Sequence, residues 1–267
     1  YVRVQSSSGQ LHYGLLQADR RVQVLDAPPW RNGQVTATEL AIEDYKLLAP
    51  CSPSKVIAVG RNYAKHAAEL GNELPQTPLL FMKPPTAVTA ADAPIFYPSQ
   101  SARVDYEGEL AIVIGELTTN CELSQVRSKI WGYTIANDVT ARDLQRKENQ
   151  WTRAKGFDSF CPLGPWIVRE IPAGAVLQTF VNSADQPVQS ASTADMIFSP
   201  EYLVAYISQT MTLLPGDVIL TGTPEGVGPV VVGDRVRIEI EGIGSLENPV
   251  LAKATKKAPA PKELALP

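Results

Sequence analysis

The chain has 267 residues, of which 44% are hydrophobic and 19% are charged, and its formal net charge is −4. This length and composition suit one large domain, or one domain with a small appendage, and they argue against disorder. The negative charge and the lack of a long basic run argue against nucleic-acid binding. No apolar stretch reaches the roughly 20 residues that a membrane-spanning helix needs. The polar opening, YVRVQSSSGQ, does not resemble a signal peptide.

Residues 1–50 alternate apolar and polar side chains, as in YVRVQ and RVQVLDA, and contain the turn-forming stretch PPWRNGQ. This alternation predicts a small β-rich N-terminal region. Residues 51–250 form the predicted main domain, in which short strands, short helices and Gly/Pro turns follow one another. The tail, residues 251–267, is rich in Ala, Lys and Pro without periodicity, and we expect it to be mobile.

The main domain is therefore expected to be a mixed α/β structure that is mostly β. Its expected elements, in chain order, are a buried strand over 55–60, a short helix around His66, strands over 109–115 and 133–136, a hairpin of 175–182 with 186–193, and a helix capped by Ser199.

The three cysteines, Cys51, Cys121 and Cys161, are odd in number and form no C-x-x-C pair. A disulfide framework is therefore not expected, and a reducing cytoplasm fits best. Cys161 lies in the apolar stretch FCPLGPW, which disfavours a reactive thiolate.

Acidic residues at a spacing of two stand out in VDYEGELAIVIG, where Asp105, Glu107 and Glu109 would share one face of an extended segment. Clustered carboxylates repel one another unless a cation neutralises them, and hard divalent ions prefer oxygen ligands. A solvated edge with alternating acids is the competing interpretation.

Asp138 follows the apolar strand in GYTIAN, at the kind of strand end where functional groups often lie. It is either a further metal ligand or an N-cap for a helix beginning in VTARDLQ.

Six segments occur in a fixed order: GRNYAKHAAE, LLFMKP, VDYEGELAIVIG, GYTIANDVTARDLQ, WTRAKGFDSFCPLGPW and GDVILTGTPEGVGP. Together they resemble the signature segments of the fumarylacetoacetate hydrolase superfamily over about residues 55–249. The resemblance implies a rolled, mixed β-sheet with short helices, usually assembled as a homodimer. It also implies that Glu107, Glu109 and Asp138 bind Mg²⁺ or Mn²⁺, and Ca²⁺ also accepts such oxygen ligands. Asp105 lies outside this triplet.

The same resemblance implies further site residues. Lys155 in WTRAKGFD corresponds to the family's lysine near the metal. Arg142 and Gln145 lie four and seven residues beyond Asp138, so that a helix would place them on one face, and in the family they reach substrate oxygens. Lys83 in FMKPP is either a carboxylate anchor or a structural charge. For Lys155, Arg142 and Gln145 an ordinary surface position is the alternative.

Two further features concern His66 and the glycine-rich loop. Thr223 in TGTPEGVG has a hydroxyl, with backbone N–H groups nearby, that would suit a substrate carboxylate. His66 and Glu69 are spaced to touch on a helix, so Glu69 would orient His66 as a general base. In the family such a pair lies on a mobile segment over the metal, so the resemblance implies that the segment 66–75, with its Gly and Pro residues, acts as a lid. A helix-surface pair without function is the alternative. His12, the other histidine, receives no role.

The sequence therefore predicts a metal-dependent enzyme of small 2-oxo or enolic acids. C–C hydrolysis of acylpyruvate-like diketo acids or decarboxylation of oxaloacetate is the first hypothesis. An isomerase or tautomerase on the same metal platform is the second. A member that only binds metal or ligand is the third. The expected partner is a small oxo acid, with neither nucleic acid nor membrane.

Overall fold

The computed structural model describes residues 1–253 except positions 70 and 72. The described chain is mostly β, and its strands form four sheets. This confirms the expected mixed, mostly β fold. None of the described helices is long and apolar enough to cross a membrane.

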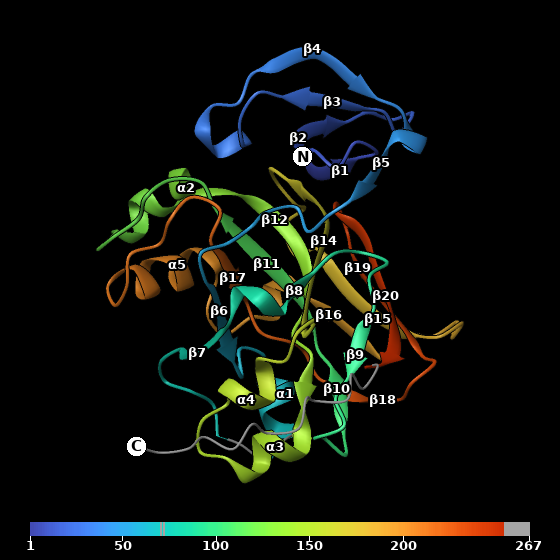
Figure 1. The fold of residues 1–267 in the computed structure, drawn as a ribbon. Helices are drawn as coiled ribbons and strands as arrows, with labels where there is room; N and C mark the ends of the chain where they lie inside the picture. The colour runs from blue at the N-terminus through green and yellow to red at the C-terminus, as the bar shows by residue number, and fades with distance from the viewer. Residues whose placement is uncertain (70, 72, 254–267) are drawn as a thin grey trace, which may run out of the picture.

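The N-terminal region is one antiparallel sheet with strand order β4-β3-β2-β1-β5. It lies at one end of the molecule, in blue in Figure 1. Its small core contains the buried side chains of Val2, Val4 and Val22. Its strands are β1 (Val2–Ser6), β2 (Leu11–Leu16), β3 (Val22–Leu25), β4 (Val35–Leu40) and β5 (Tyr45–Leu47).

The central sheet has seven strands in the order β7-β6-β17-β11-β12-β14-β8. It is mixed, since β6 runs parallel to β17 and β8 parallel to β14, whereas the other neighbours are antiparallel. Every residue of β11 is buried, which explains why ELAIVI reads as a continuous apolar run after Glu109. The strands are β6 (Val56–Gly60), β7 (Leu79–Lys83), β8 (Val88–Thr89), β11 (Gly108–Ile114), β12 (Ile130–Asn137), β14 (Cys161–Val168) and β17 (Val218–Leu220).

Two further sheets complete the body. A five-stranded sheet has the order β16-β15-β19-β20-β9, and a three-stranded sheet has the order β13-β10-β18. The hairpin predicted from 175–193 is confirmed as the antiparallel pair β15–β16. The strands are β9 (Ile95–Tyr97), β10 (Val104–Tyr106), β13 (Thr140–Ala141), β15 (Val176–Val181), β16 (Gln189–Ser192), β18 (Gly228–Val230), β19 (Arg235–Ile240) and β20 (Gly244–Ala252).

The C-terminal boundary differs slightly from the expected one at residue 250. Strand β20 continues to Ala252, because 250–252 pair in parallel with β9. Two residues assigned to the tail therefore belong to a strand. The remaining tail prediction, for 254–267, lies outside the described residues.

The main core lies between the central sheet and the second five-stranded sheet, and the longest helix, α5 (Pro200–Ser208), packs into it through Leu203, Val204 and Ile207. The predicted cap is confirmed, since the Ser199 side chain accepts a hydrogen bond from the Tyr202 amide. The other helices are short: α1 (Ala64–Glu69), α2 (Val126–Lys129), α3 (Arg142–Lys147), α4 (Thr152–Lys155), and the 3₁₀ turns η1 (Pro29–Arg31), η2 (Ile42–Asp44), η3 (Pro85–Ala87), η4 (Leu123–Gln125) and η5 (Thr193–Asp195).

One end of the central sheet positions the candidate site. Strand β11 begins at Gly108 and β12 ends at Asn137, and these two residues are paired in the antiparallel ladder. The residues just outside both strands therefore leave the sheet side by side. Helices α1, α3 and α4 gather at this end of the molecule (Figure 1).

Candidate active site

Three carboxylates converge at the paired ends of β11 and β12. Glu107 precedes β11, Glu109 is its second residue, and Asp138 follows β12. The Asp138 amide donates to the Glu107 carbonyl oxygen over 2.8 Å, which fixes the two strand ends together. One oxygen from each carboxylate lies within 4.8 Å of the others. Since none of the three residues is more than 4% exposed, the solvated-edge interpretation does not fit this geometry.

Asp105 does not join this group, because the extended segment is broken at Glu107. Strand β10, which carries Asp105, belongs to the three-stranded sheet, whereas Glu109 lies in the central sheet. The three acids therefore do not lie on a single strand, although Arg142 contacts both Asp105 and Glu107. Asp105 instead accepts from Arg103 Nε and Arg142 Nε, each over 2.8 Å.

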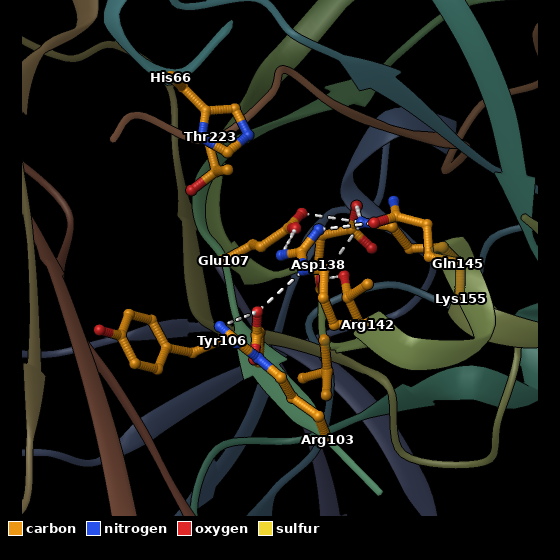
Figure 2. A network of polar contacts seen from close by, with 12 residues as sticks. His66, Arg103, Tyr106, Glu107, Asp138, Arg142, Gln145, Lys155 and Thr223 are labelled. Atoms are coloured by element: carbon orange, nitrogen blue, oxygen red, sulfur yellow. Dashed lines mark hydrogen bonds and ion pairs between the residues drawn. The ribbon is translucent and has the colours of Figure 1, made fainter. Parts of the chain in front are cut away.

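Buried cations hold two of the three carboxylates. The Lys155 ammonium donates to Glu107 Oε2 over 2.8 Å and to Asp138 Oδ2 over 2.5 Å. Lys83 donates to Asp138 Oδ1 over 2.5 Å, and Arg142 Nη2 donates to Glu107 Oε1 over 2.5 Å. Figure 2 shows Arg142 and Lys155 reaching the same glutamate. Burial opposes ionisation of Glu107, but Lys155 and Arg142 outweigh it and lower the pKa of that carboxyl.

Glu109 is different, since no Lys or Arg of the described chain lies within ion-pair distance of it. Its Oε2 accepts from the Gly222 amide over 2.7 Å. Burial, together with the negative charges of Asp138 and Glu107, raises its pKa well above the usual range. A buried carboxylate without a cationic partner is what a divalent ion would neutralise. The residues present therefore fit a hard metal ion.

Lys155 stays protonated in this arrangement. Burial alone would lower its pKa, but Asp138 and Glu107 raise it above the usual lysine value. Lys155 therefore brings a fixed positive charge to the site.

The start of helix α3 excludes one of the two interpretations of Asp138, namely that it caps a helix. The N-cap of α3 is Ala141, without a side-chain cap, so Asp138 does not cap this helix. Arg142 begins α3, and its Nη1 donates to Gln145 Oε1 over 2.7 Å. The expected proximity of Arg142 and Gln145 is thus present. The guanidinium is already engaged with Asp105, Glu107 and Gln145, so the contact of Arg142 with a substrate stays a prediction.

His66 lies on α1 with its ring buried, and its Nδ1 lies 3.2 Å from Glu69 Oε2. The Glu69 carboxylate also accepts from the Gly226 amide, at 3.1 and 3.2 Å from its two oxygens. The pair therefore links α1 to the glycine-rich loop rather than lying on a free helix surface. In the view of Figure 2 the imidazole of His66 lies above the Glu107 carboxylate.

The glycine-rich loop lies beside β11. Thr223 is buried, and its hydroxyl donates to the Gly108 carbonyl oxygen over 2.9 Å and accepts from Gln189 Nε2 over 2.8 Å. Sequence reasoning missed Gln189, because it comes from β16 in another sheet and no local motif marks it. Arg103, the second partner of Asp105, was also missed, although it lies only two residues before Asp105 in the sequence.

The cysteines play no part in this geometry. All three are buried and unbonded, which confirms the absence of a disulfide framework in the described chain. Burial raises the pKa of Cys161 to about 12, which disfavours a nucleophilic thiolate.

A mostly β fold with a carboxylate cluster at its sheet end is what the motifs predicted, and comparison with known proteins agrees. The model of the fumarylacetoacetate (FAA) hydrolase C-terminal family matches residues 55–251. The chain belongs to this family. A second model, described as Rv2993c-like, N-terminal, matches residues 1–50.

Relatives in sequence carry several names. The chain is 49% identical over 229 residues to Protein Rv2993c of Mycobacterium tuberculosis, covering 84% of this chain and 86% of that one. It is 41% identical over 226 residues to the mitochondrial oxaloacetate tautomerase fahd2 of Xenopus laevis, covering 79% and 70%.

Solved structures give the same fold. A 5-carboxymethyl-2-hydroxymuconate delta-isomerase from Mycobacterium smegmatis is 46% identical, with a TM-score of 0.87 over 94% of this chain and 99% of that one. A fumarylpyruvate hydrolase from Pseudomonas aeruginosa, solved with Mn²⁺ and pyruvate, is 35% identical, with a TM-score of 0.71 over 78% and 92%. Enzymes of this family thus include isomerases, tautomerases and hydrolases.

Proposed function

We propose that this chain is a divalent-metal-dependent enzyme that interconverts the keto and enol forms, or double-bond isomers, of a small 2-oxo dicarboxylic acid. The observation that carries the proposal is the buried cluster of Glu107, Glu109 and Asp138, in which Glu109 has no cationic partner among the described residues. Mg²⁺ or Mn²⁺ is the proposed ion, in line with the Mn²⁺ of the related fumarylpyruvate hydrolase.

The charges of the network favour a doubly negative substrate. Its four carboxylates and four basic side chains balance, so a divalent ion leaves the site with two positive charges. A dicarboxylate would neutralise them, whereas a neutral ligand would not. The acids are Asp105, Glu107, Glu109 and Asp138, and the bases are Lys83, Arg103, Arg142 and Lys155.

The side chains of this chain then have separate tasks. When bound, the ion would polarise the 2-oxo group and stabilise negative charge on its oxygen. Lys155, held protonated between Glu107 and Asp138, adds a fixed positive charge beside that oxygen. Gln145 accepts from Arg142 through Oε1, which leaves its amide N–H groups for a substrate oxygen. Thr223 is proposed to contact a substrate carboxylate through the backbone N–H groups of its loop, because its hydroxyl already donates to Gly108.

His66 is the proposed proton carrier. An imidazole exchanges a proton near neutral pH, and Glu69 holds its Nδ1, so that Nε2 is the atom that would take or give the proton. Lys155 is assigned to charge stabilisation instead, because its ammonium donates to both Glu107 and Asp138.

C–C bond hydrolysis, with decarboxylation as its relative, is the second candidate function. The pairing of a buried His66 with Glu69 favours it, since the same imidazole would activate a water molecule. Isomerisation stands first because the isomerase and the tautomerase are more similar to this chain than the fumarylpyruvate hydrolase is. The homodimer expected from the motifs also remains a proposal.

A screen with added Mg²⁺ or Mn²⁺ tests the proposal, using oxaloacetate, acetylpyruvate, fumarylpyruvate and fumarylacetoacetate. Enol–keto interconversion and product release are followed in parallel. We expect metal-dependent interconversion of oxaloacetate to be faster than any carbon–carbon cleavage. Faster cleavage of a diketo acid would put the hydrolase first. Metal binding without turnover of any of the four acids would make the chain a binding protein.

A further inference from the structure

Gln189 reaches the carboxylate cluster from a different sheet. It is the first residue of β16 and is only 1% exposed. Its Oε1 accepts from the Gly108 amide over 3.0 Å, and its Nε2 donates to Thr223 Oγ1 over 2.8 Å and to the Pro224 carbonyl oxygen over 3.0 Å. Both ends of the amide are therefore used, on two separate segments of the site.

The first of these segments lies between two proposed metal ligands. Gly108 separates Glu107 from Glu109, so its two peptide groups set the relative position of both side chains. Gln189 holds the N–H of Gly108, and Thr223 holds its C=O over 2.9 Å. Since Thr223 is itself bonded to Gln189, one side chain controls both contacts.

The second segment is the loop after β17. Gln189 fixes this loop at Thr223 and Pro224, and the neighbouring Gly222 amide donates to Glu109 Oε2 over 2.7 Å. The position of Glu109 therefore depends on Gln189 along two routes, through its own backbone and through the loop that orients its carboxylate.

Close packing at Gly108 shows how tightly the two sheets meet here. A Cβ on Gly108 would lie 2.4 Å from Thr179 Oγ1 and 3.2 Å from Gln189 Oε1. A side chain at Gly108 would force the Thr179 hydroxyl to move and would crowd the Gln189 amide oxygen. The glycine in the E-G-E motif is therefore needed for this approach, although its backbone conformation is ordinary.

We propose that Gln189 is a positioning residue that sets the spacing of Glu107 and Glu109 for a divalent ion. This inference rests on the proposed function, because it assumes that these glutamates bind a metal. Gln189 acts through Gly108, Thr223 and Pro224, and partners that orient metal ligands typically change metal affinity about 10- to 100-fold when they are removed.

The test compares Gln189→Met, which keeps the length of the side chain but removes both hydrogen-bonding ends, with Ser190→Ala at the exposed neighbouring position of β16. Mn²⁺ affinity is measured by calorimetry well below the melting temperature, and thermal unfolding is measured without metal. We expect Gln189→Met to bind Mn²⁺ about 10- to 100-fold more weakly, with turnover recovered at saturating Mn²⁺. Ser190→Ala should match the wild type in both measurements.

A purely structural glutamine would lower the melting temperature and leave the Mn²⁺ affinity of the folded protein unchanged. Affinity within twofold of the wild type in Gln189→Met would therefore overturn the proposal. Thr223→Val removes the hydroxyl that links Gln189 to Gly108. If Gln189→Met does not fold, the Mn²⁺ affinity of Thr223→Val tests the proposal in its place. Thr223→Val should also weaken Mn²⁺ binding, and in the double variant the two losses should not add, because both act on Gly108.

The outcome is separable from that of the proposed function. A wild-type protein that binds neither Mg²⁺ nor Mn²⁺ would overturn both. A wild-type protein that binds Mn²⁺ but converts no oxo acid would remove the proposed function only. The affinities of Gln189→Met and Thr223→Val would still decide the role of Gln189.

Discussion

The two sides of the candidate active site are held in place by different kinds of contact. On the carboxylate side, Glu107 and Asp138 lie at paired strand ends, and both accept hydrogen bonds from the buried ammonium of Lys155. On the imidazole side, His66 lies on a helix of only six residues, and Glu69, with 36% of its side chain exposed, ties it to the Gly226 amide.

This difference suggests a division of labour. Buried ion pairs with several partners are costly to disturb, because separating them leaves charges uncompensated in a poorly hydrated place. A short helix held by a half-exposed carboxylate opens at little cost. The carboxylate side is therefore expected to be preorganised for charge, whereas the imidazole side adjusts when a substrate binds.

Among substitutions on the carboxylate side, Glu109→Gln should have the largest effect. We expect loss of divalent-ion binding and of essentially all turnover, because this residue supplies a ligand with no cationic partner of its own. The metal-free variant should be at least as stable as the wild type. Burial and neighbouring acids raise the pKa of Glu109, so its ionised form is unfavourable when folded, and a neutral amide can still accept from Gly222.

Calorimetry with Mg²⁺ and Mn²⁺, steady-state kinetics and thermal unfolding check this prediction. Glu116→Gln, at an exposed acid that pairs with Lys129 on the surface, is the matched control and should change none of the three. Retained ion binding in Glu109→Gln would remove this residue from the metal site.

On the imidazole side, His66→Ala removes the proposed proton carrier. Because His66 is the proposed proton carrier, isomerisation should fall by roughly 10²–10⁴-fold, the usual contribution of a positioned base, and hydrolysis should fall similarly if His66 activates water. Metal affinity should survive, since His66 is not a proposed ligand. Stopped-flow or steady-state assays on each accepted oxo acid measure the effect, and His12→Ala, at the other histidine, is the control.

Lys155→Met should affect more reactions than His66→Ala does, because Lys155 belongs to the carboxylate side. Every candidate reaction passes through enolate-like charge, so all of them should fall, by roughly 10²–10³-fold if Lys155 acts as one preorganised electrostatic group. His66→Ala should spare decarboxylation more than hydrolysis. If His66→Ala left both hydrolysis and isomerisation intact, the pair with Glu69 would be a structural contact, and proton transfer would have to be assigned elsewhere.

The sequence predicted the carboxylate side better than its surroundings. Glu107, Glu109 and Asp138 could be selected because their spacing and strand ends are local features, and the buried strands β6 and β12 follow from apolar runs. The convergence of the three acids depends on the pairing of Gly108 with Asn137, which is a property of the whole sheet.

Residues that act between sheets were not predictable in this way. The break at Glu107 separates two sheets inside what reads as one extended segment, so the spacing alone did not distinguish Asp105 from the two glutamates, and only the family resemblance did. Gln189 carries no local signature, because its partners are 81 residues away at Gly108 and 34 residues away at Thr223. Arg142 was assigned to the substrate, and its ion pairs with Asp105 and Glu107 became visible only in three dimensions.

The smallest expected effect concerns motion on the imidazole side. Amides of residues 66–69, 71, 73 and 74, the described part of the predicted lid that carries N–H groups, should exchange with deuterium faster than those of β6 in the free protein, because only His66 and Ala67 of α1 are buried. Addition of Mg²⁺ with oxalate, a mimic of the 2-oxo acid end, should slow exchange there by about 3- to 10-fold, whereas β6 should change little.

Glu69→Gln should raise exchange in the free state, since a neutral amide is a weaker acceptor for the Gly226 N–H than a carboxylate. Equal exchange in the free and bound states would identify α1 as a fixed structural helix. The contrast between a rigid carboxylate side and an adjustable imidazole side would then have no basis.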